Sequence, residues 1–315
     1  MKRIKEKKFG SILPWWQPYI FIFPFFAVYL IFQIFPIFYS FSVSLTKWNG
    51  FTEKVFVGFN NYKTLISDPR FYIAFMNTLK FMLIPIPILI IGGLLLASLM
   101  TSPFVKGKRL YQICTFLPFL LSSVASGFLF GFLFDAKIGT INKLLLSLNL
   151  IQPGELNWLS SPQLAPIVVM IIIIWRNFGF YMVLMIAGIS NIPSELNDAA
   201  MVDGANFIQI FFRITIPQMR NMITFVVLQG VIHGFQLIEE PMTLLTGVIT
   251  GGSPVLAGGP ERSALTMMWY MYDNAFGTNI NFGYATSIAF GVFFIIAVTS
   301  LLLFRILSRR EDDVS

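Results

Sequence analysis

The chain has 315 residues, of which 56% are hydrophobic, 16% aromatic and only 12% charged, and its net charge is +7. Soluble domains contain about 25% charged residues, so this composition excludes an ordinary soluble protein and a disordered one. The basic residues lie beside hydrophobic runs, which favours a membrane protein over a nucleic-acid-binding protein. With one histidine and one cysteine, Cys114, the sequence predicts no intrachain disulfide, no metal site and no catalytic residues.

Six stretches are long and apolar enough to cross a bilayer, which takes roughly 20 residues. Only helices and closed barrels satisfy the backbone in lipid, and apolar runs without alternation are typical of helices. The sequence therefore predicts an all-α polytopic membrane protein with six transmembrane helices. In chain order, the predicted spans are residues 19–43, 81–100, 113–134, 164–189, 222–238 and 282–304.

These spans form one predicted transmembrane domain, residues 19–306, between a basic N-terminal tail (1–18) and a short C-terminal tail (307–315). The first span is longer than the apolar region of a signal peptide, about 7–15 residues, so we expect an uncleaved anchor. If the N-terminus is cytoplasmic, thirteen of the 22 lysines and arginines fall on the cytoplasmic side and seven outside. The positive-inside rule then predicts that both termini are cytoplasmic.

The loop between the fourth and fifth spans, residues 190–221, has its own helical signals. Pro193 and Ser194 predict a helix start, with Glu195 near its positive end. Gly204 predicts a break, because a residue without Cβ turns there cheaply. A second short helix follows, with an apolar stripe that ends before Pro217. Two short helices at a bend suit the docking of a soluble partner, and an amphipathic connector on the membrane surface fits the same pattern.

The sequence contains no phosphate-binding loop of the G-x-x-x-x-G-K-[ST] type, so this chain is not expected to hydrolyse ATP. Asp135, Glu239 and Glu240 are expected only at the outer ends of spans, which disfavours coupling to protons or sodium ions. A pore-forming subunit driven by another protein fits best. The alternatives are a stand-alone secondary transporter of a small polar solute, and a membrane-bound enzyme or assembly factor.

Four polar residues within the predicted spans are candidates for a substrate path. Arg176 in the fourth span costs about 2.5–3.5 kcal/mol on insertion scales, so it should face protein or water. It either donates to a polar substrate or bonds backbone carbonyls. Gln229, His233 and Gln236 share one face of the fifth span at helical spacing. That face either lines a path or bonds neighbouring helices.

The inner loop also resembles a known motif. The segments Glu195-Leu196-Asn197-Asp198-Ala199-Ala200, Asp203-Gly204-Ala205 and Ile214-Thr215-Ile216-Pro217 resemble the EAA loop of binding-protein-dependent ABC importer permeases. One departure is Asp198, where that family usually has glutamate. Further segments are similar to the sugar-permease branch of the family, among them Thr46-Lys47-Trp48, Asp68-Pro69-Arg70-Phe71, Asn77-Thr78, Glu239-Glu240-Pro241 and Gly258-Gly259-Pro260.

The resemblance implies a permease subunit of an ATP-driven carbohydrate importer in the cell membrane, with an oligosaccharide as the expected substrate. It implies that the inner loop docks on a cytoplasmic ATPase dimer through Glu195, Asp198, Ala199, Ala200, Asp203 and Gly204. The other implied partners are a second permease subunit, giving a heterodimer, an extracytoplasmic solute-binding protein and membrane lipid, but no nucleic acid. ATP and magnesium are expected in the ATPase, and no cofactor is expected on this chain.

Overall fold

The computed structural model describes residues 16–102, 105–152, 154–246 and 256–312. Within these residues the chain is helical apart from one short β-hairpin. Four helices are long and apolar enough to cross a membrane, or up to six if each of two bent pairs counts as one span. The four are Tyr19–Ser44, Pro69–Thr101, Ala165–Ser190 and Phe282–Leu307. The predicted number of six is therefore reached only when both bent pairs are included.

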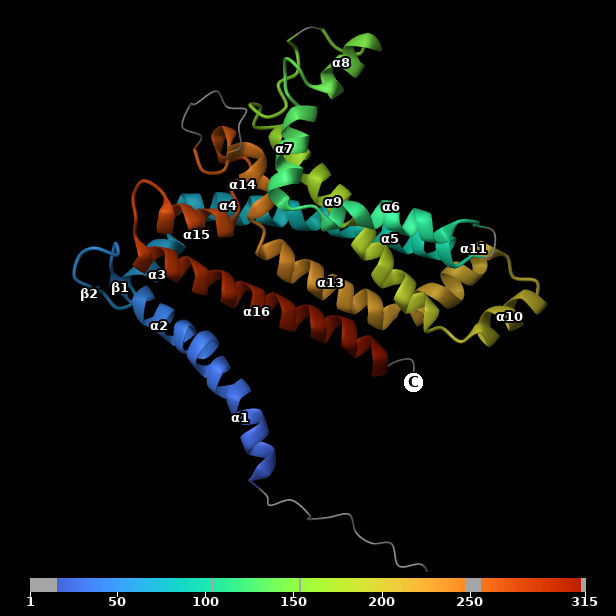
Figure 1. Cartoon of the computed structure of the whole chain (residues 1–315), viewed down its shortest axis with the longest axis horizontal. Helices are drawn as coiled ribbons and strands as arrows, with labels where there is room; N and C mark the ends of the chain where they lie inside the picture. Colours follow the sequence, from blue (N-terminus) through green and yellow to red (C-terminus); the bar gives the residue numbers. More distant parts are fainter. Residues whose placement is uncertain (1–15, 103–104, 153, 247–255, 313–315) are drawn as a thin grey trace, which may run out of the picture.

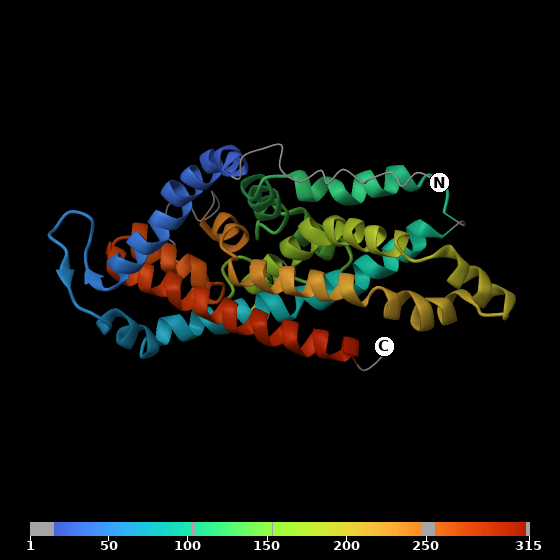
Figure 2. The same ribbon diagram turned by 90° about the horizontal axis from the view of Figure 1, so that it is seen from below.

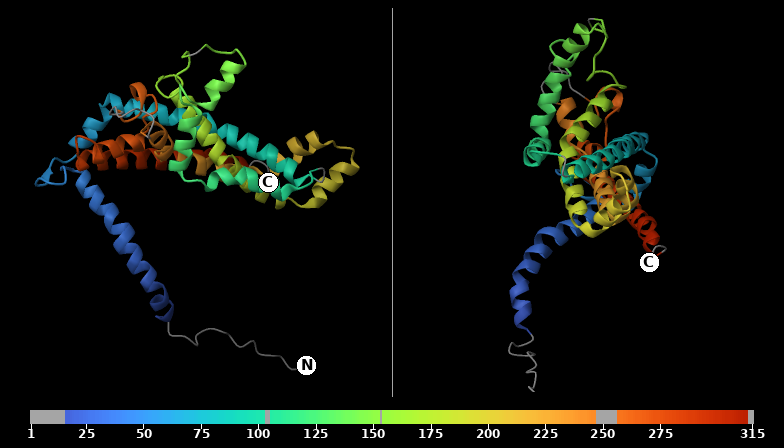
Figure 3. Two further views of the ribbon diagram at one scale, coloured as in Figure 1. Left: turned by 45° about the horizontal axis from the view of Figure 1, so that its top comes forward. Right: turned by 90° about the vertical axis from the view of Figure 1, so that its right-hand side faces the viewer.

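The first candidate span joins α1 (Gln17–Tyr29), a π-helical turn η1 (Leu30–Ile34) and α2 (Phe35–Ser44). The π-helical turn precedes Pro36, which has no N–H to donate to an ordinary helical bond. Within this span, α2 packs against α16 of the bundle, and α1 projects away from the bundle (Figure 1, Figure 3). None of its most apolar window is buried, so this surface requires lipid or another protein chain around it.

A hairpin and three helices follow. Strand β1 (Thr46–Lys47) pairs antiparallel with β2 (Val55–Phe56), and then come α3 (Asn60–Ile66), α4 (Pro69–Leu83) and α5 (Pro85–Thr101). The helix that contains the second span starts at Pro69, twelve residues before the predicted start. Asp68 caps it by accepting a hydrogen bond from the Arg70 backbone N–H at 2.9 Å.

The third predicted span, residues 113–134, is not one straight helix. Helix α6 (Lys108–Leu120) and helix α7 (Ser123–Leu133) meet at 97°. The backbone is extended at Leu121 and Ser122, and the Ser122 hydroxyl caps α7 by accepting from the Ala125 N–H at 3.2 Å. A short helix α8 (Thr140–Ser147) follows outside this pair.

Helix α9 (Ala165–Ser190) is the central element of the bundle. It packs along α5 and α6, and its side chains Val168, Val169 and Ile172 are fully buried. Gly179 permits the close crossing with α6, because a Cβ atom there would lie 2.1 Å from the Thr115 carbonyl oxygen. The helix thus fixes one side of the protein interior against α5 and α6.

The segment after α9 holds α10 (Ser194–Val202), α11 (Phe207–Ile210), the π-helical turn η2 (Phe211–Thr215), α12 (Ile216–Gln218), α13 (Arg220–Phe235) and α14 (Glu239–Thr246). Pro217 does not end the second short helix as predicted. It lies in the first turn of α12, where its missing N–H costs little, and the break falls at Met219 instead. Helix α13 lies between α16 and α9, and α14 continues from it at an angle of 41° (Figure 2).

The C-terminal part contains a 3-10 turn η3 (Pro260–Arg262), α15 (Met267–Phe276) and the long helix α16 (Phe282–Asp312). Tyr270 and Tyr284 both donate hydrogen bonds to one carboxylate oxygen of Asp68. Burial alone would raise the pKa of Asp68, but these hydrogen bonds, together with the Arg70 backbone N–H and the Arg70 charge, hold that pKa below its ordinary value. Asn77 donates to the carbonyl oxygens of Arg262 and Leu265 at 2.9 and 3.2 Å. The Asp68 bonds join the start of α4 to α15 and α16, and the Asn77 bonds join the middle of α4 to the segment before α15.

Candidate functional site

The inner loop lies at one end of the molecule, with α10 and α11 beyond the ends of the long helices (Figure 1). Helix α10 starts after Pro193 and carries Glu195 in its first turn. It ends in a Schellman motif, in which the Ala205 N–H donates to Ala200 O at 2.9 Å and the Gly204 N–H donates to Met201 O at 3.1 Å. Gly204 has a φ of +80°, the left-handed conformation that favours glycine. The predicted bend is therefore present at the predicted residue.

The side chains of α10 and its turn are largely free of contacts with the rest of the chain. The three acidic residues Glu195, Asp198 and Asp203 are exposed, as is Ala199, and Ala200 is half-buried. Three large apolar side chains are exposed on the same short helix: Leu196 (40%), Met201 (57%) and Val202 (88%). An exposed helix that carries both acidic and apolar side chains suits contact with another protein.

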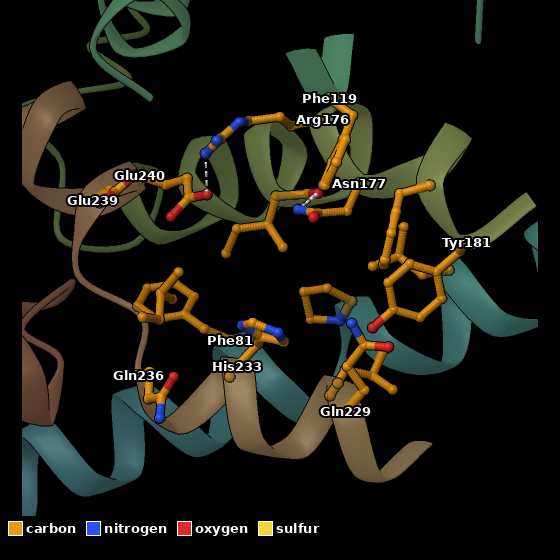
Figure 4. Close-up of a pocket in the computed structure, with 18 of the residues that line it drawn as sticks. Phe81, Phe119, Arg176, Asn177, Tyr181, Gln229, His233, Gln236, Glu239 and Glu240 are labelled. Carbon is orange, nitrogen blue, oxygen red and sulfur yellow. Dashed lines mark hydrogen bonds and ion pairs between the residues drawn. The ribbon is translucent and has the colours of Figure 1, made fainter. Parts of the chain in front are cut away.

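The four polar span residues line one cavity. It has a volume of about 370 Å³ and lies between α9 and α13, with α14 at one end. Figure 4 shows Arg176 and Asn177 on the α9 side, facing Gln229 and His233 on the α13 side. Gln236 also lines the cavity, although α13 ends at Phe235 and Gln236 is its C-cap rather than a residue of the helix.

Arg176 has partners that neither sequence-based alternative included. Its Nη1 atom lies 2.6 Å from Glu240 Oε1 and also donates to the Ser123 hydroxyl at 2.7 Å. The same hydroxyl donates to a carboxylate oxygen of Glu239. The Arg176 and Glu240 side chains are only 17% and 11% exposed, so this is a largely buried ion pair. Arg176 is thus neutralised by a carboxylate rather than by backbone carbonyls.

The two broken helices bring this cluster together. Ser123 lies in the first turn of α7, and Glu239 and Glu240 lie in the first turn of α14. Helices α7 and α14 pack against each other, and both α7 and α14 contact α9, which carries Arg176. The positive end of α14 stabilises the two carboxylates within its first turn. Glu239 and Glu240 were predicted only at the outer end of a span, and a mid-span arginine in need of a counter-ion was the signal in the sequence that pointed to them.

Two buried atoms on the cavity wall have no hydrogen-bond partner within the described residues. They are Arg176 Nε and Gln229 Oε1. A buried polar atom without a partner costs about 1–3 kcal/mol, so both positions favour water or a polar ligand. His233 and Gln236 are exposed. The wall thus offers donors and acceptors from several side chains, next to the rings of Phe119 and Phe180.

Residues 89–312 match the family described as "Binding-protein-dependent transport system inner membrane component". The chain belongs to this family. It is a multi-pass inner-membrane permease of the ABC transporter class, in which the ATPase is a separate subunit. The inner loop and the four polar cavity residues Arg176, Gln229, His233 and Gln236 lie within the matched residues.

Individual relatives cover nearly the whole chain. The probable ABC transporter permease protein YurN of Bacillus subtilis is 33% identical over 94% of this chain and 97% of its own length. The lactose transport system permease protein LacF of Rhizobium radiobacter is 31% identical over 96% of each chain. A solved bacterial alginate ABC transporter, in complex with an alginate pentasaccharide-bound periplasmic protein, has a chain of the same fold. That chain has a TM-score of 0.78 and 23% identity, with 94% of each chain covered.

Proposed function

We propose that this chain is a permease subunit of an ATP-driven, binding-protein-dependent carbohydrate importer, and that its substrate is an oligosaccharide. The observation that carries the proposal is the family match over residues 89–312, together with a lactose permease that is 31% identical over almost the full length. The partners are a cytoplasmic ATPase dimer that binds ATP and magnesium, a second permease subunit and an extracytoplasmic solute-binding protein. The two permease subunits form a heterodimer around one translocation path.

Arg176, Gln229, His233 and Gln236 form the part of that path contributed by this chain. Sugar hydroxyls need both donors and acceptors, and amide and imidazole groups supply both. The unpartnered Gln229 Oε1 and Arg176 Nε support this role, because a hydroxyl-rich ligand offers the missing partners. The apolar faces of sugar rings pack well on aromatic rings such as Phe119 on the same wall.

Helix α10 and its turn form the contact with the ATPase. Closure of the ATPase dimer on ATP moves this helix, and the movement reaches the cavity through the helical path from α11 to α13. Exposed Met201 and Val202 supply apolar contact area, while Asp198 and Asp203 supply carboxylates for basic groups on the partner. The small side chains of Ala199 and Ala200 permit close approach. In this arrangement α10 and both chain termini are cytoplasmic.

An uptake assay in proteoliposomes that contain the complete transporter tests this path. The substrate is radiolabelled lactose or the ligand that co-purifies with the binding protein. Gln229→Leu and Gln236→Leu should each lower ATP-driven uptake at least several-fold while leaving assembly and basal ATP hydrolysis close to normal. Arg176→Lys keeps the charge but loses the planar fork, so uptake should also fall. Gln152→Leu, at an exposed glutamine outside the cavity, is the matched control.

Normal uptake by all three cavity variants would place the sugar path elsewhere. Uptake by this chain alone, driven by an ion gradient without any ATPase, would instead support the stand-alone secondary transporter.

A further inference from the structure

The charged groups on the described part of the cavity wall are few. Arg176, Glu239 and Glu240 are the basic and acidic side chains there. His233 and Tyr181 also line the wall. The charge that a substrate meets is therefore set by one arginine and two glutamates.

The positive charge is already engaged. Arg176 Nη1 lies 2.6 Å from Glu240 Oε1 and 2.7 Å from the Ser123 hydroxyl. A substrate carboxylate would find the charge of Arg176 already balanced by Glu240, which α14 holds next to the arginine at a high effective concentration. Displacing Glu240 would leave its carboxylate, 11% exposed, without a counter-ion. The ion pair thus keeps Arg176 from acting as an anion-binding group.

The second carboxylate is left without a cation among the described residues. Glu239 is exposed, and one of its oxygens accepts from Ser123, which is a neutral donor. After Arg176 and Glu240 cancel, the wall keeps one net negative charge. In a cavity with mostly apolar walls this charge is screened less than it would be in water.

We propose that this wall makes the permease selective for uncharged sugars: Glu239 repels sugars that carry carboxylates, such as uronates, and Glu240 prevents Arg176 from attracting them. The inference rests on the proposed function, because it assigns a charge class to the substrate of the same cavity. The fold alone does not set this preference, since a transporter of acidic alginate has a chain with the same fold. The side chains of the wall set it.

The test measures the electrostatic potential of the cavity directly, without the need for transport. In the detergent-solubilised transporter, a thiol is placed on the wall by Gln236→Cys in a Cys114→Ser background. Its modification rates at pH 8 are measured with a sulfonate-bearing and a trimethylammonium-bearing methanethiosulfonate, each divided by the rate with free 2-mercaptoethanol. The expected preference for the cationic reagent is about tenfold.

Glu239→Gln should remove most of that preference, whereas the matched control Glu261→Gln, at an acidic residue outside the cavity lining, should leave it unchanged. A thiol placed on the outer loop by Thr278→Cys should not respond to Glu239→Gln. In the Gln236→Cys chain with both glutamates present, equal rates for the two reagents, or a faster reaction with the anionic one, would overturn the inference. A preference for the cationic reagent that Glu239→Gln leaves intact would also overturn it.

The outcome is separable from that of the proposed function. Normal uptake by the Gln229→Leu and Gln236→Leu variants would remove the sugar path from this wall, while the reagent ratio would still report its charge. A ratio near one combined with impaired uptake in those variants would overturn the charge selectivity and leave the path in place.

Discussion

Replacement of Glu240 tests how strongly the cavity depends on its ion pair. In Glu240→Leu, Arg176 loses a carboxylate partner 2.6 Å away in a site where the two side chains are only 17% and 11% exposed. Breaking a buried ion pair by removing one partner costs about 3–5 kcal/mol. Arg176 keeps its hydrogen bond to Ser123 and some contact with solvent. We therefore expect a loss at the lower end of that range, about 3 kcal/mol of unfolding free energy.

The double variant Arg176→Leu, Glu240→Leu should recover most of this loss. Removing both charges leaves no uncompensated ion, and apolar replacement of a complete buried pair is often neutral or stabilising. The predicted coupling energy between the two positions is about 2 kcal/mol. Glu239→Leu is the matched single variant: its exposed carboxylate bonds only a neutral hydroxyl, so its loss should cost about 1 kcal/mol or less.

The assay is unfolding of the purified subunit in mixed micelles, followed by circular dichroism as a denaturing detergent is added. The four members of the cycle are compared at one pH and one salt concentration. If the effects of the two single replacements simply add in the double variant, Arg176 and Glu240 do not interact and the reasoning fails. The reasoning also fails if Glu240→Leu is as stable as the unchanged chain.

Three further predictions concern other parts of the molecule. A Cβ at Gly204 would meet no atom within 4 Å, so only the φ of +80° penalises substitution, by about 1–2 kcal/mol. Gly204→Val should therefore lower uptake and stimulated ATP hydrolysis together, whereas Gly204→Asn should keep most of both, because asparagine tolerates this conformation. Equal effects of the two variants would contradict the coupling role of the turn. Because the pKa of Asp68 is lowered in the folded state, its stabilising effect is present above the ordinary carboxyl pKa and is lost as the pH falls through the lowered value. The difference in unfolding free energy between the unchanged chain and Asp68→Asn should therefore shrink from pH 6 to pH 3. A constant difference would count against the Tyr270 hydrogen bond as the source of the stabilisation. Phe51 and Val202 are each 88% exposed, and the proposed orientation places them on opposite sides of the membrane. Phe51→Cys should therefore react with an impermeant thiol reagent in intact cells, and Val202→Cys only after permeabilisation. The reverse pattern would invert the proposed orientation.

The parts of the fold that sequence could predict are those with local causes. A long apolar run without charges is helical in lipid whatever its neighbours are, so helices cover the first, fourth and sixth predicted spans within a residue or two at their starts. The turn after α10 depends on the missing Cβ of Gly204 and on bonds within six residues. Such features need no knowledge of the rest of the chain.

The right-angled bend between α6 and α7 has weaker local signals: Pro118 lies in the last turn of α6 and Ser122 caps α7, but neither fixes the angle between the helices. The run around Leu121 and Ser122 is apolar or neutral, and neither residue is glycine or proline. The bend is favoured by packing that the sequence does not display, since α7 lies against α14 and Thr243 donates to the Ser123 carbonyl oxygen at 3.2 Å. The fifth predicted span, residues 222–238, likewise contains a turn that the sequence does not display: the backbone turns at Gln236, and α14 continues from α13 at 41°.

These two bends change the argument about energy coupling. The predicted spans contain no carboxylate, which disfavoured a proton-coupled transporter. In the structure, however, the turn after α13 places Glu240 on the cavity wall beside Arg176. The lack of carboxylates in the predicted spans therefore no longer counts against proton coupling. The position of a membrane arginine's counter-ion has to be sought past the nominal ends of the spans, because a bent helix pair can return a terminal residue to the interior. What now argues against a stand-alone proton-coupled transporter is the family, in which a separate ATPase subunit supplies the energy.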